Sequence, residues 1–485
     1  MAKKWALPLA IAVSLSAGAG GGYLASSKFG NQQDYSGTNG INTNETRNRP
    51  GFEKTEEWTK LEQAYELIQS QYVEKVGNKQ LIEGAITGML SSLKDPYSVY
   101  MDKETAKQFN EALDSTFEGI GTEIGMEDGH IVIVSPYKDS PAEKAGLKPK
   151  DQLLKVDGKS VEDLDLYKTR LLIRGKKGTS VSLEIKRAGI SRPLTMDIVR
   201  DEIPLETVFS SIKKVHGEKI GYIELSSFSE HTSEDFKKQL GAMEKKKIDG
   251  LVIDVRGNPG GLLTSVESIL GEFIPKDKAY LQIEQRDGET QSYYTKLKEE
   301  KNYPIAVLTD KGSASAAEIL AGAMEEAGGY ALIGEKTFGK GTVQQPVPMG
   351  DGSNIKLTLF KWLTPEGHWI HKKGIEPTIE VHQPQYFNSQ PLNIEQPLKL
   401  DSNDEQVGHA QRILRGLGFE PGREDGYFDE KTEIAVKAFQ QHEGIKVTGE
   451  LDKKTASHME AGIIEKIKNE NNDIQLQTAL KYVAE

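Results

Sequence analysis

The sequence lacks cysteine entirely over its 485 residues. That absence excludes disulfide bonds, thiol catalysis and a lipid-bearing lipobox cysteine. The nine histidines are scattered, and none stands in an HExxH pattern or another spacing typical of metal ligands, so a metallopeptidase is not indicated. Basic residues number 61 against 73 acidic ones. This balance argues against a nucleic-acid partner, because such binding depends on clustered positive charge.

The N-terminus holds an uncharged stretch from Trp5 to Ser27, preceded by Lys3 and Lys4. At about 1.5 Å per residue it is long enough to span a bilayer, and the preceding charges place the rest of the chain outside the cytoplasm. We expect a single-pass signal anchor over residues 1–30, with a cleaved signal peptide and secretion as the alternative. A flexible linker rich in Asn, Gly and Thr is predicted over residues 31–55.

The segment from Lys311 to Gln345 carries the strongest chemical signal. An apolar run over residues 303–308 predicts a buried strand, and Gly312 to Ser315 is a small-residue turn before the apolar stretch 316–324. The pattern predicts a strand, a turn and a helix. A serine at such a turn lies beside free backbone N–H groups that can stabilise an oxyanion.

A lysine follows this serine-rich turn within a glycine-flanked loop, residues 337–341. A serine hydroxyl is a weak nucleophile and needs a base, and a lysine amine serves as one only when neutral. Burial against apolar neighbours such as Phe338 would lower the pKa of Lys340. Gln344 can accept a hydrogen bond from the amine without adding a charge.

The motifs GSASAAEI and GEKTFGKGTVQ resemble the signature of the carboxyl-terminal processing proteases, also called tail-specific proteases. These are serine endopeptidases with a Ser–Lys pair. The resemblance implies that Ser315 is the nucleophile, Lys340 the base and Gln344 the assisting residue, with no cofactor and no metal. Ser313 is then not the nucleophile. His371 is the alternative base that we considered, and we reject it as an ordinary surface histidine at a strand end.

The run LVIDVRGNPGG, residues 251–261, reads as a buried strand that breaks into a Gly/Pro turn. Such a turn presents backbone amides. In the resembling family this turn and the residue after the nucleophile supply the two oxyanion-hole N–H groups. The resemblance therefore implies Gly261 and Ala316 for this role.

Residues 116–200 resemble a PDZ domain, through the SPAEKAGL turn and helix and the DQLLKVDG strand and turn. A PDZ domain takes an extended peptide as an added strand and holds its terminal carboxylate in a loop of amides. We expect Gly119, Ile120 and Gly121 to form that loop. Arg174 matches an arginine near the end of the family's PDZ domain and is a candidate peptide sensor that reaches toward the active site, the alternative being a surface arginine.

The remaining segments complete a multidomain α/β (α+β) organisation. Residues 56–115 contain two amphipathic helices whose apolar stripes predict either a core or a homodimer surface. The protease core is expected over 201–385 and a linker over 386–403. Residues 404–460 resemble a three-helix peptidoglycan-binding domain, which either grips cell-wall glycan or serves as a spacer or dimer contact. One terminal helix is expected over 461–485.

Together these features predict a membrane-tethered serine endopeptidase of the cell envelope. Its PDZ domain would recognise the C-terminal tails of protein substrates, and the Ser–Lys pair would cleave through an acyl-enzyme. Two alternatives stay open at this point. One is a catalytically silent scaffold with PDZ and wall-binding domains, and the other is a peptidoglycan hydrolase.

Overall fold

The computed structural model describes residues 55–485 apart from 114–115, 128, 138, 163, 165, 188–189 and 191. The expected anchor and nearly all of the expected linker lie outside the described residues. Within the described part of the chain, no helix combines the length and apolar character that crossing a membrane requires.

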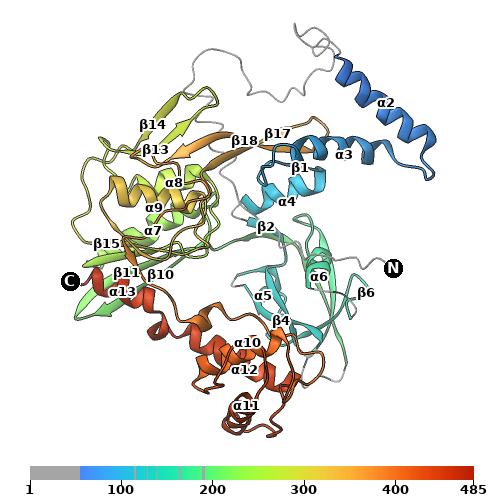
Figure 1. The fold of residues 1–485 in the computed structure, drawn as a ribbon, viewed down its shortest axis with the longest axis vertical. Coiled ribbons are helices and arrows are strands. Elements are labelled where there is room, and N and C mark those ends of the chain that lie inside the picture. Colours follow the sequence, from blue (N-terminus) through green and yellow to red (C-terminus); the bar gives the residue numbers. More distant parts are fainter. Residues whose placement is uncertain are drawn as a thin grey trace.

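The N-terminal region comprises helices α2 (Glu56–Gln71) and α3 (Asn78–Ser91), strand β1 (Val99–Met101) and helix α4 (Lys103–Leu113). The side chain of Thr55 caps α2 by accepting a hydrogen bond from the Trp58 amide. No residue of α2 is buried, and Leu90 is the one buried residue of α3. The apolar stripe of α2 is therefore not part of a core in the described chain, that of α3 is buried only at Leu90, and α2 projects away from the other domains (Figure 1).

The PDZ-like domain is a small antiparallel sheet with two short helices. Its sheet follows the order β3-β4-β5-β7-β8, with β6 paired to β5, while β2 pairs separately with β9. Ile133, Val181 and Leu183 are fully buried in its core. The elements are β2 (Thr116–Gly119), β3 (Thr122–Glu127), β4 (His130–Pro136), α5 (Pro141–Lys144), β5 (Gln152–Val156), β6 (Lys159–Ser160), α6 (Leu166–Ile173), β7 (Ser180–Lys186), β8 (Leu194–Val199) and β9 (Asp201–Pro204).

The predicted protease core, residues 201–385, is built on a six-stranded sheet in the order β10-β11-β12-β15-β16-β19. The strands run parallel except for β10, which pairs antiparallel to β11. Every residue of β12 and β15 is buried, as expected for parallel strands covered on both faces. The elements of this layer are β10 (Val208–Val215), β11 (Glu218–Leu225), α7 (Thr232–Lys245), β12 (Gly250–Asp254), α8 (Leu263–Leu270), β15 (Ile305–Thr309), α9 (Ala316–Gly322), the π-helix η2 (Ala323–Ala327), β16 (Ala331–Gly334) and β19 (Ile379–Glu380).

The two faces of this sheet are covered by different parts of the chain. Leu251, Ile253 and Val307 pack in one cluster with residues of α7, α8 and α9, whereas Val252 and Leu308 pack on the opposite face. There they meet α13 (Ile474–Tyr482), the last helix of the described chain. The alternation follows from the period of two along a strand.

A second sheet of the core includes a strand from the N-terminal region. Its order is β1-β18-β13-β14, with β17 paired to β18. Strand β1 pairs with β18 in a register that sets Val99 opposite Lys356. The other strands are β13 (Ala279–Glu284), β14 (Thr290–Tyr294), β17 (Thr342–Pro348) and β18 (Asn354–Leu363). The N-terminal region is therefore joined to the core by backbone hydrogen bonds.

The C-terminal domain contains η3 (Gln385–Asn388), α10 (Glu405–Leu417), α11 (Glu430–His442) and α12 (Lys453–Lys468). Asp404, Asp429 and Asp452 cap the three α-helices, each accepting a backbone N–H of the first turn. The single helix expected over 461–485 is wrong. That range instead holds the end of α12, the short η4 (Glu470–Asn472) and the separate α13, which packs on the protease core.

Candidate active site

Ser315 lies at the turn between β15 and α9, which confirms the expected strand, turn and helix. It is the residue that precedes α9, and its side chain is buried. Its backbone has φ 55° and ψ −114°, a conformation that non-glycine residues rarely adopt. Such strain is of order 1–3 kcal/mol and concentrates at functional sites. The surrounding structure must therefore hold this turn firmly.

The carboxylate of Glu318 holds the turn at Ser315, and it also joins this turn to the loop that carries Lys340. Its Oε2 atom accepts hydrogen bonds from the backbone amides of Ser315 (2.9 Å) and Lys340 (2.8 Å). Its Oε1 atom accepts from the Gly339 amide (2.7 Å) and the Thr337 hydroxyl (2.6 Å). The backbone amides of the two predicted catalytic residues, Ser315 and Lys340, thus donate to the same carboxylate.

Glu318 is fully buried, and this burial raises the pKa of its carboxyl group although the four hydrogen bonds oppose the shift. The sequence analysis did not identify Glu318. Its signal was present, because a glutamate three residues after a serine N-cap is typical of a capping box. What that pattern could not show was the bonds from the distant lysine loop.

The amine of Lys340 is buried without a hydrogen-bond partner among the described residues. Its Nζ atom lies 5.0 Å from the centroid of the Tyr97 ring. The pKa of Lys340 is lowered to about 7, mainly by burial and also by the nearby Lys356, while Glu318 and Asp95 act in the opposite direction. An amine with this pKa is neutral in a large fraction of molecules at neutral pH.

Phe338 does not bury this amine, contrary to the sequence-based expectation. Its side chain is 56% exposed. The apolar cover is supplied by Tyr97, which lies far away in the sequence. The physical reasoning on burial therefore holds, but the residue named for it was wrong.

Gln344 is fully buried in β17, and its side chain is held by two hydroxyl groups. Its Nε2 atom donates to Thr342 Oγ1 (2.9 Å) and Thr358 Oγ1 (3.1 Å), which occupies both of its donors. Its Oε1 atom is buried and accepts no hydrogen bond from a described group. The predicted bond from the Lys340 amine is thus not formed here, although the acceptor that it needs is free.

The glycine-rich turn after β12 lies directly against Ser315. Asn258 holds the turn, donating from Nδ2 to the Leu225 carbonyl (2.7 Å) and accepting the Gly260 amide (2.8 Å). A Cβ atom added at Gly260, where φ is 105°, would stand 2.9 Å from Ser315 Cβ and 3.0 Å from the Ala316 nitrogen. Only a glycine permits this approach.

The two amides expected to form the oxyanion hole are both available. Among the described residues, no group accepts a hydrogen bond from the Gly261 or Ala316 N–H. A side chain at Gly261 would overlap the Phe228 carbonyl, at 2.0 Å from its oxygen. The sequence analysis missed Asn258, whose bonds fix the turn that carries Gly261.

The predicted peptide-binding loop lines a groove of about 350 Å³ in the PDZ-like domain. Gly119, Ile120 and Gly121 all contribute to its wall. Arg174 lies in the same groove, with its Cζ atom 4.9 Å from the Phe117 ring centroid and its Nε atom buried without a hydrogen-bond partner among the described residues. The structure thus places Arg174 in the same groove as the predicted peptide-binding loop.

His371 is not the ordinary surface residue that the sequence suggested. Its ring stacks on Trp369 at a centroid distance of 5.3 Å and meets the edge of Tyr97 at 6.2 Å. Its Nδ1 atom is buried without a partner among the described residues, and burial lowers the pKa of the ring. His371 therefore belongs to the wall of the site, behind Tyr97.

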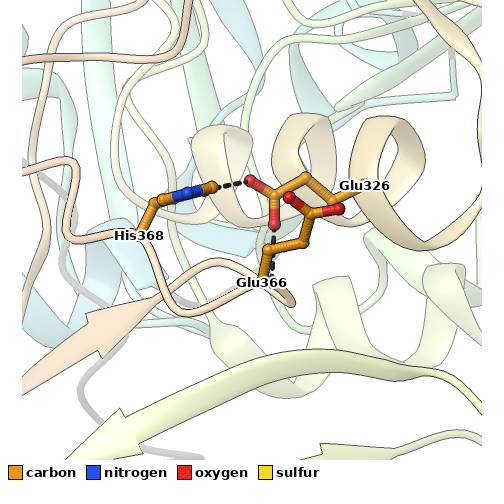
Figure 2. A group of neighbouring side chains, drawn as sticks. All are labelled: Glu326, Glu366 and His368. Atoms are coloured by element: carbon orange, nitrogen blue, oxygen red, sulfur yellow. Dashed lines mark hydrogen bonds and ion pairs between the residues drawn. The ribbon is translucent and has the colours of Figure 1, made fainter.

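One group of described residues has donor atoms close enough together to hold a metal ion, namely Glu326, Glu366 and His368. Figure 2 shows the carboxylate of Glu326 between the other two. Glu326 accepts hydrogen bonds from His368 Nδ1 (3.0 Å) and from the backbone amide of Glu366 (2.7 Å), and it raises the pKa of His368. These bonds tie the turn after β18 to η2.

Comparison with known proteins places this arrangement in a family. The family model "Peptidase family S41" matches residues 219–381, "PDZ domain" matches 119–198, a peptidoglycan binding domain matches 403–459, and "Activating protease CtpB N-terminal domain" matches 15–105. Carboxy-terminal processing protease CtpB of Bacillus subtilis (strain 168) is 60% identical over 429 residues, covering 88% of this chain and 89% of that protein. This chain belongs to the carboxy-terminal processing proteases.

Another relative, carboxy-terminal processing protease CtpA of the same organism, is 42% identical over 422 residues, covering 87% of this chain and 89% of that protein. A solved photosystem II D1 C-terminal processing protease is 27% identical with a TM-score of 0.42, covering 68% of this chain and 88% of that one. The family models and the two Bacillus subtilis relatives confirm the predicted family, the multidomain organisation and the serine-peptidase class.

Proposed function

We propose that this peptidase cleaves peptide bonds through a Ser–Lys acyl-enzyme mechanism. The observation that carries the proposal is the buried Lys340 amine, which has no hydrogen-bond partner within the described ranges and whose loop shares the Glu318 carboxylate with the strained turn of Ser315. Its pKa of about 7 lets it accept a proton near neutral pH. An amine buried only for structural reasons would be expected to have hydrogen-bond acceptors.

In the first step the Lys340 amine takes the hydroxyl proton of Ser315, and the oxygen attacks the carbonyl carbon of the scissile bond. The N–H groups of Gly261 and Ala316 stabilise the resulting oxyanion. The ammonium then gives its proton to the leaving amine, and an acyl-enzyme remains. A water molecule, deprotonated by the same amine, hydrolyses the ester. In the reacting enzyme, Gln344 Oε1 would accept an N–H of the amine and keep the lone pair of the amine directed at the serine.

The PDZ domain selects substrates by their C-terminal tails in this proposal. The tail would bind in the groove as an added strand, with its carboxylate at the amides of Gly119, Ile120 and Gly121. Arg174 would sense an occupied groove, because its guanidinium already lies there with an unpartnered Nε atom. Upstream residues of the substrate would then enter the active site.

We place the enzyme at the cell envelope, tethered to the membrane by its N-terminal segment, with the catalytic domain outside the cytoplasm. The charge pattern around residues 3–27 supports this location. The peptidoglycan binding domain would contact wall glycan. Two chains would associate as a homodimer, since exposed apolar side chains such as Leu61, Ile68 and Ile82 on α2 and α3 need a partner.

The test is cleavage of an unfolded protein by the wild type, Lys340→Ala and the control Lys336→Ala, with products sized by mass spectrometry. Lys336 belongs to the same loop but its side chain is half exposed and pairs with Glu376. We expect Lys340→Ala to lose at least about a thousandfold in rate, and Lys336→Ala to retain wild-type activity. Equal cleavage by wild type and Lys340→Ala would refute the mechanism.

A further inference from the structure

A segment of the N-terminal region, residues 95–98, reaches into the active site. Its Tyr97 ring lies over the Lys340 amine, at 5.0 Å from Nζ to the ring centroid. The residue is separated from the lysine by the whole PDZ domain and most of the protease core in sequence. The N-terminal region therefore contributes directly to the surroundings of the catalytic base.

The segment is fixed by a chain of hydrogen bonds that ends at Gln344. Asp95 accepts from the Tyr97 amide (3.0 Å) and the Ser98 hydroxyl (2.6 Å). Ser98 Oγ accepts from the backbone amide of Thr358 (3.0 Å), and Thr358 Oγ1 accepts from Gln344 Nε2 (3.1 Å). The position of Tyr97 is thus coupled to the orientation of Gln344.

Several ionisable groups surround the same amine from different elements. Lys356 on β18 disfavours its charge, whereas Glu318 on α9 and Asp95 before β1 favour it. His371 lies behind Tyr97. None of these groups forms a hydrogen bond with the amine, and the ring of Tyr97 lies over it.

We propose that Tyr97 is a positioning residue for the catalytic lysine, covering its amine and excluding water, so that the N-terminal region completes the active site of the protease core. This rests on the proposed role of Lys340. The inference goes beyond that role because it assigns a part in the reaction to a segment outside the protease core.

Two opposing effects of the ring decide the sign of the expected change. The π face attracts an ammonium and favours its charged form. The ring also keeps water from the amine, which disfavours the charged form. Burial is the largest cause of the lowered pKa of Lys340, so the second effect should prevail. Removing the ring should make the lysine more basic.

The experiment measures kcat and KM of the full chain on a tail-bearing peptide between pH 6 and 10 for wild type, Tyr97→Ala and Tyr97→Phe. For Tyr97→Ala we expect the acid limb of kcat to move upward by about one pH unit, which lowers the rate at pH 7 by about fivefold to tenfold and leaves it near wild type above pH 9. KM should change little. Tyr97→Phe keeps the ring and should match the wild type.

The midpoint of the acid limb reports only on folded molecules, so a partly unfolded Tyr97→Ala sample would lose amplitude without shifting it. A rate loss that is equal at every pH, or an unchanged profile, would overturn the inference. So would Tyr97→Phe behaving like Tyr97→Ala. Lys340→Ala distinguishes failure of the proposed function from failure of this inference. If Lys340→Ala remains active, the proposed function is refuted. If Lys340→Ala is inactive and the pH profile of Tyr97→Ala is unshifted, only the role of Tyr97 is refuted.

Discussion

Two basic side chains of the protease core differ in how they are accommodated: Arg256, which is partly buried, and Lys340, which is fully buried. Every nitrogen of the Arg256 guanidinium donates to an oxygen of Asp254 at the end of β12 or of Asp473 and Gln475 at the start of α13. The Lys340 amine has no hydrogen-bond partner among the described residues. The first arrangement keeps a charge permanently, and the second leaves a base ready to gain and lose a proton.

The comparison distinguishes a charge that stabilises the fold, at Arg256, from an amine that is suited to proton transfer, at Lys340. A buried ion with complete hydrogen bonding ties elements together, here the turn after β12 and the C-terminal helix α13. A buried amine without partners destabilises the fold, and such a feature persists where function requires it. Substitutions at the two positions should therefore act in opposite directions on stability.

The largest effect is expected for Arg256→Met, which leaves Asp254 and Asp473 buried without their cation. We expect the free energy of unfolding to fall by about 3 kcal/mol. Arg415→Met is the matched control, because Arg415 forms an exposed ion pair with Glu420 and should change stability by less than about 1 kcal/mol. Urea denaturation of the three proteins measures this. A loss no greater than that of the control would show that the cluster does not hold α13 in place.

Glu318 combines features of both positions: its carboxylate is buried and accepts four hydrogen bonds, as a structural charge would, yet it lies at the candidate active site. The variant Glu318→Gln tests this group. A neutral amide offers one oxygen to four donors and turns an NH₂ group toward some of them. We expect kcat to fall by about a hundredfold with KM little changed. Because the negative charge of Glu318 raises the pKa of Lys340, its loss should also move the acid limb of kcat to lower pH.

The control for this variant is Glu325→Gln on η2, where the carboxylate accepts from the Thr378 hydroxyl outside the site. It should retain wild-type kinetics. An acid limb that stays in place in Glu318→Gln would indicate that the carboxylate and the amine do not interact.

The smallest effect, a change in thermal stability, is expected for Lys340→Met, which replaces the buried amine by an apolar side chain of similar length. The folded-state pKa of about 7 lies below the ordinary lysine value, so the unfolded chain binds more protons between pH 7 and about 10. Wild-type stability should rise with pH across that window, and the penalty is fully present below pH 7. We expect the inactive variant to have a Tm higher by about 5 °C at pH 6, with the gap shrinking toward pH 10. A lower Tm than wild type at pH 6 would contradict this.

Local patterns predicted the elements of the site well. The small-residue turn at Ser315 and the glycines around Lys340 appear where expected, because turn chemistry depends on neighbouring residues. The loop at Gly119–Gly121 likewise lines a groove. The pocket itself was not predictable in this way. Tyr97 and Thr358 reach the Lys340–Gln344 pair through strand pairings that no local pattern encodes.

The end of the chain shows the same limit. The apolar residues of the last segment predicted a helix, but only packing decided that it breaks after Lys468 and that α13 covers the second face of the core sheet. Similarly, the apolar stripe of α2 predicted an amphipathic helix, while its lack of any buried residue emerged only from the folded chain.

The sequence by itself determined which residues could serve as nucleophile, base and amide donors, because residue type and turn geometry are local properties. Only the tertiary structure decided that the amine of Lys340 is buried, with no hydrogen-bond partner in the described part of the chain. The lowered pKa of this amine depends on its burial, with the Tyr97 ring over it, and on the charges of Lys356 and Glu318, and these three residues come from segments far apart in the sequence.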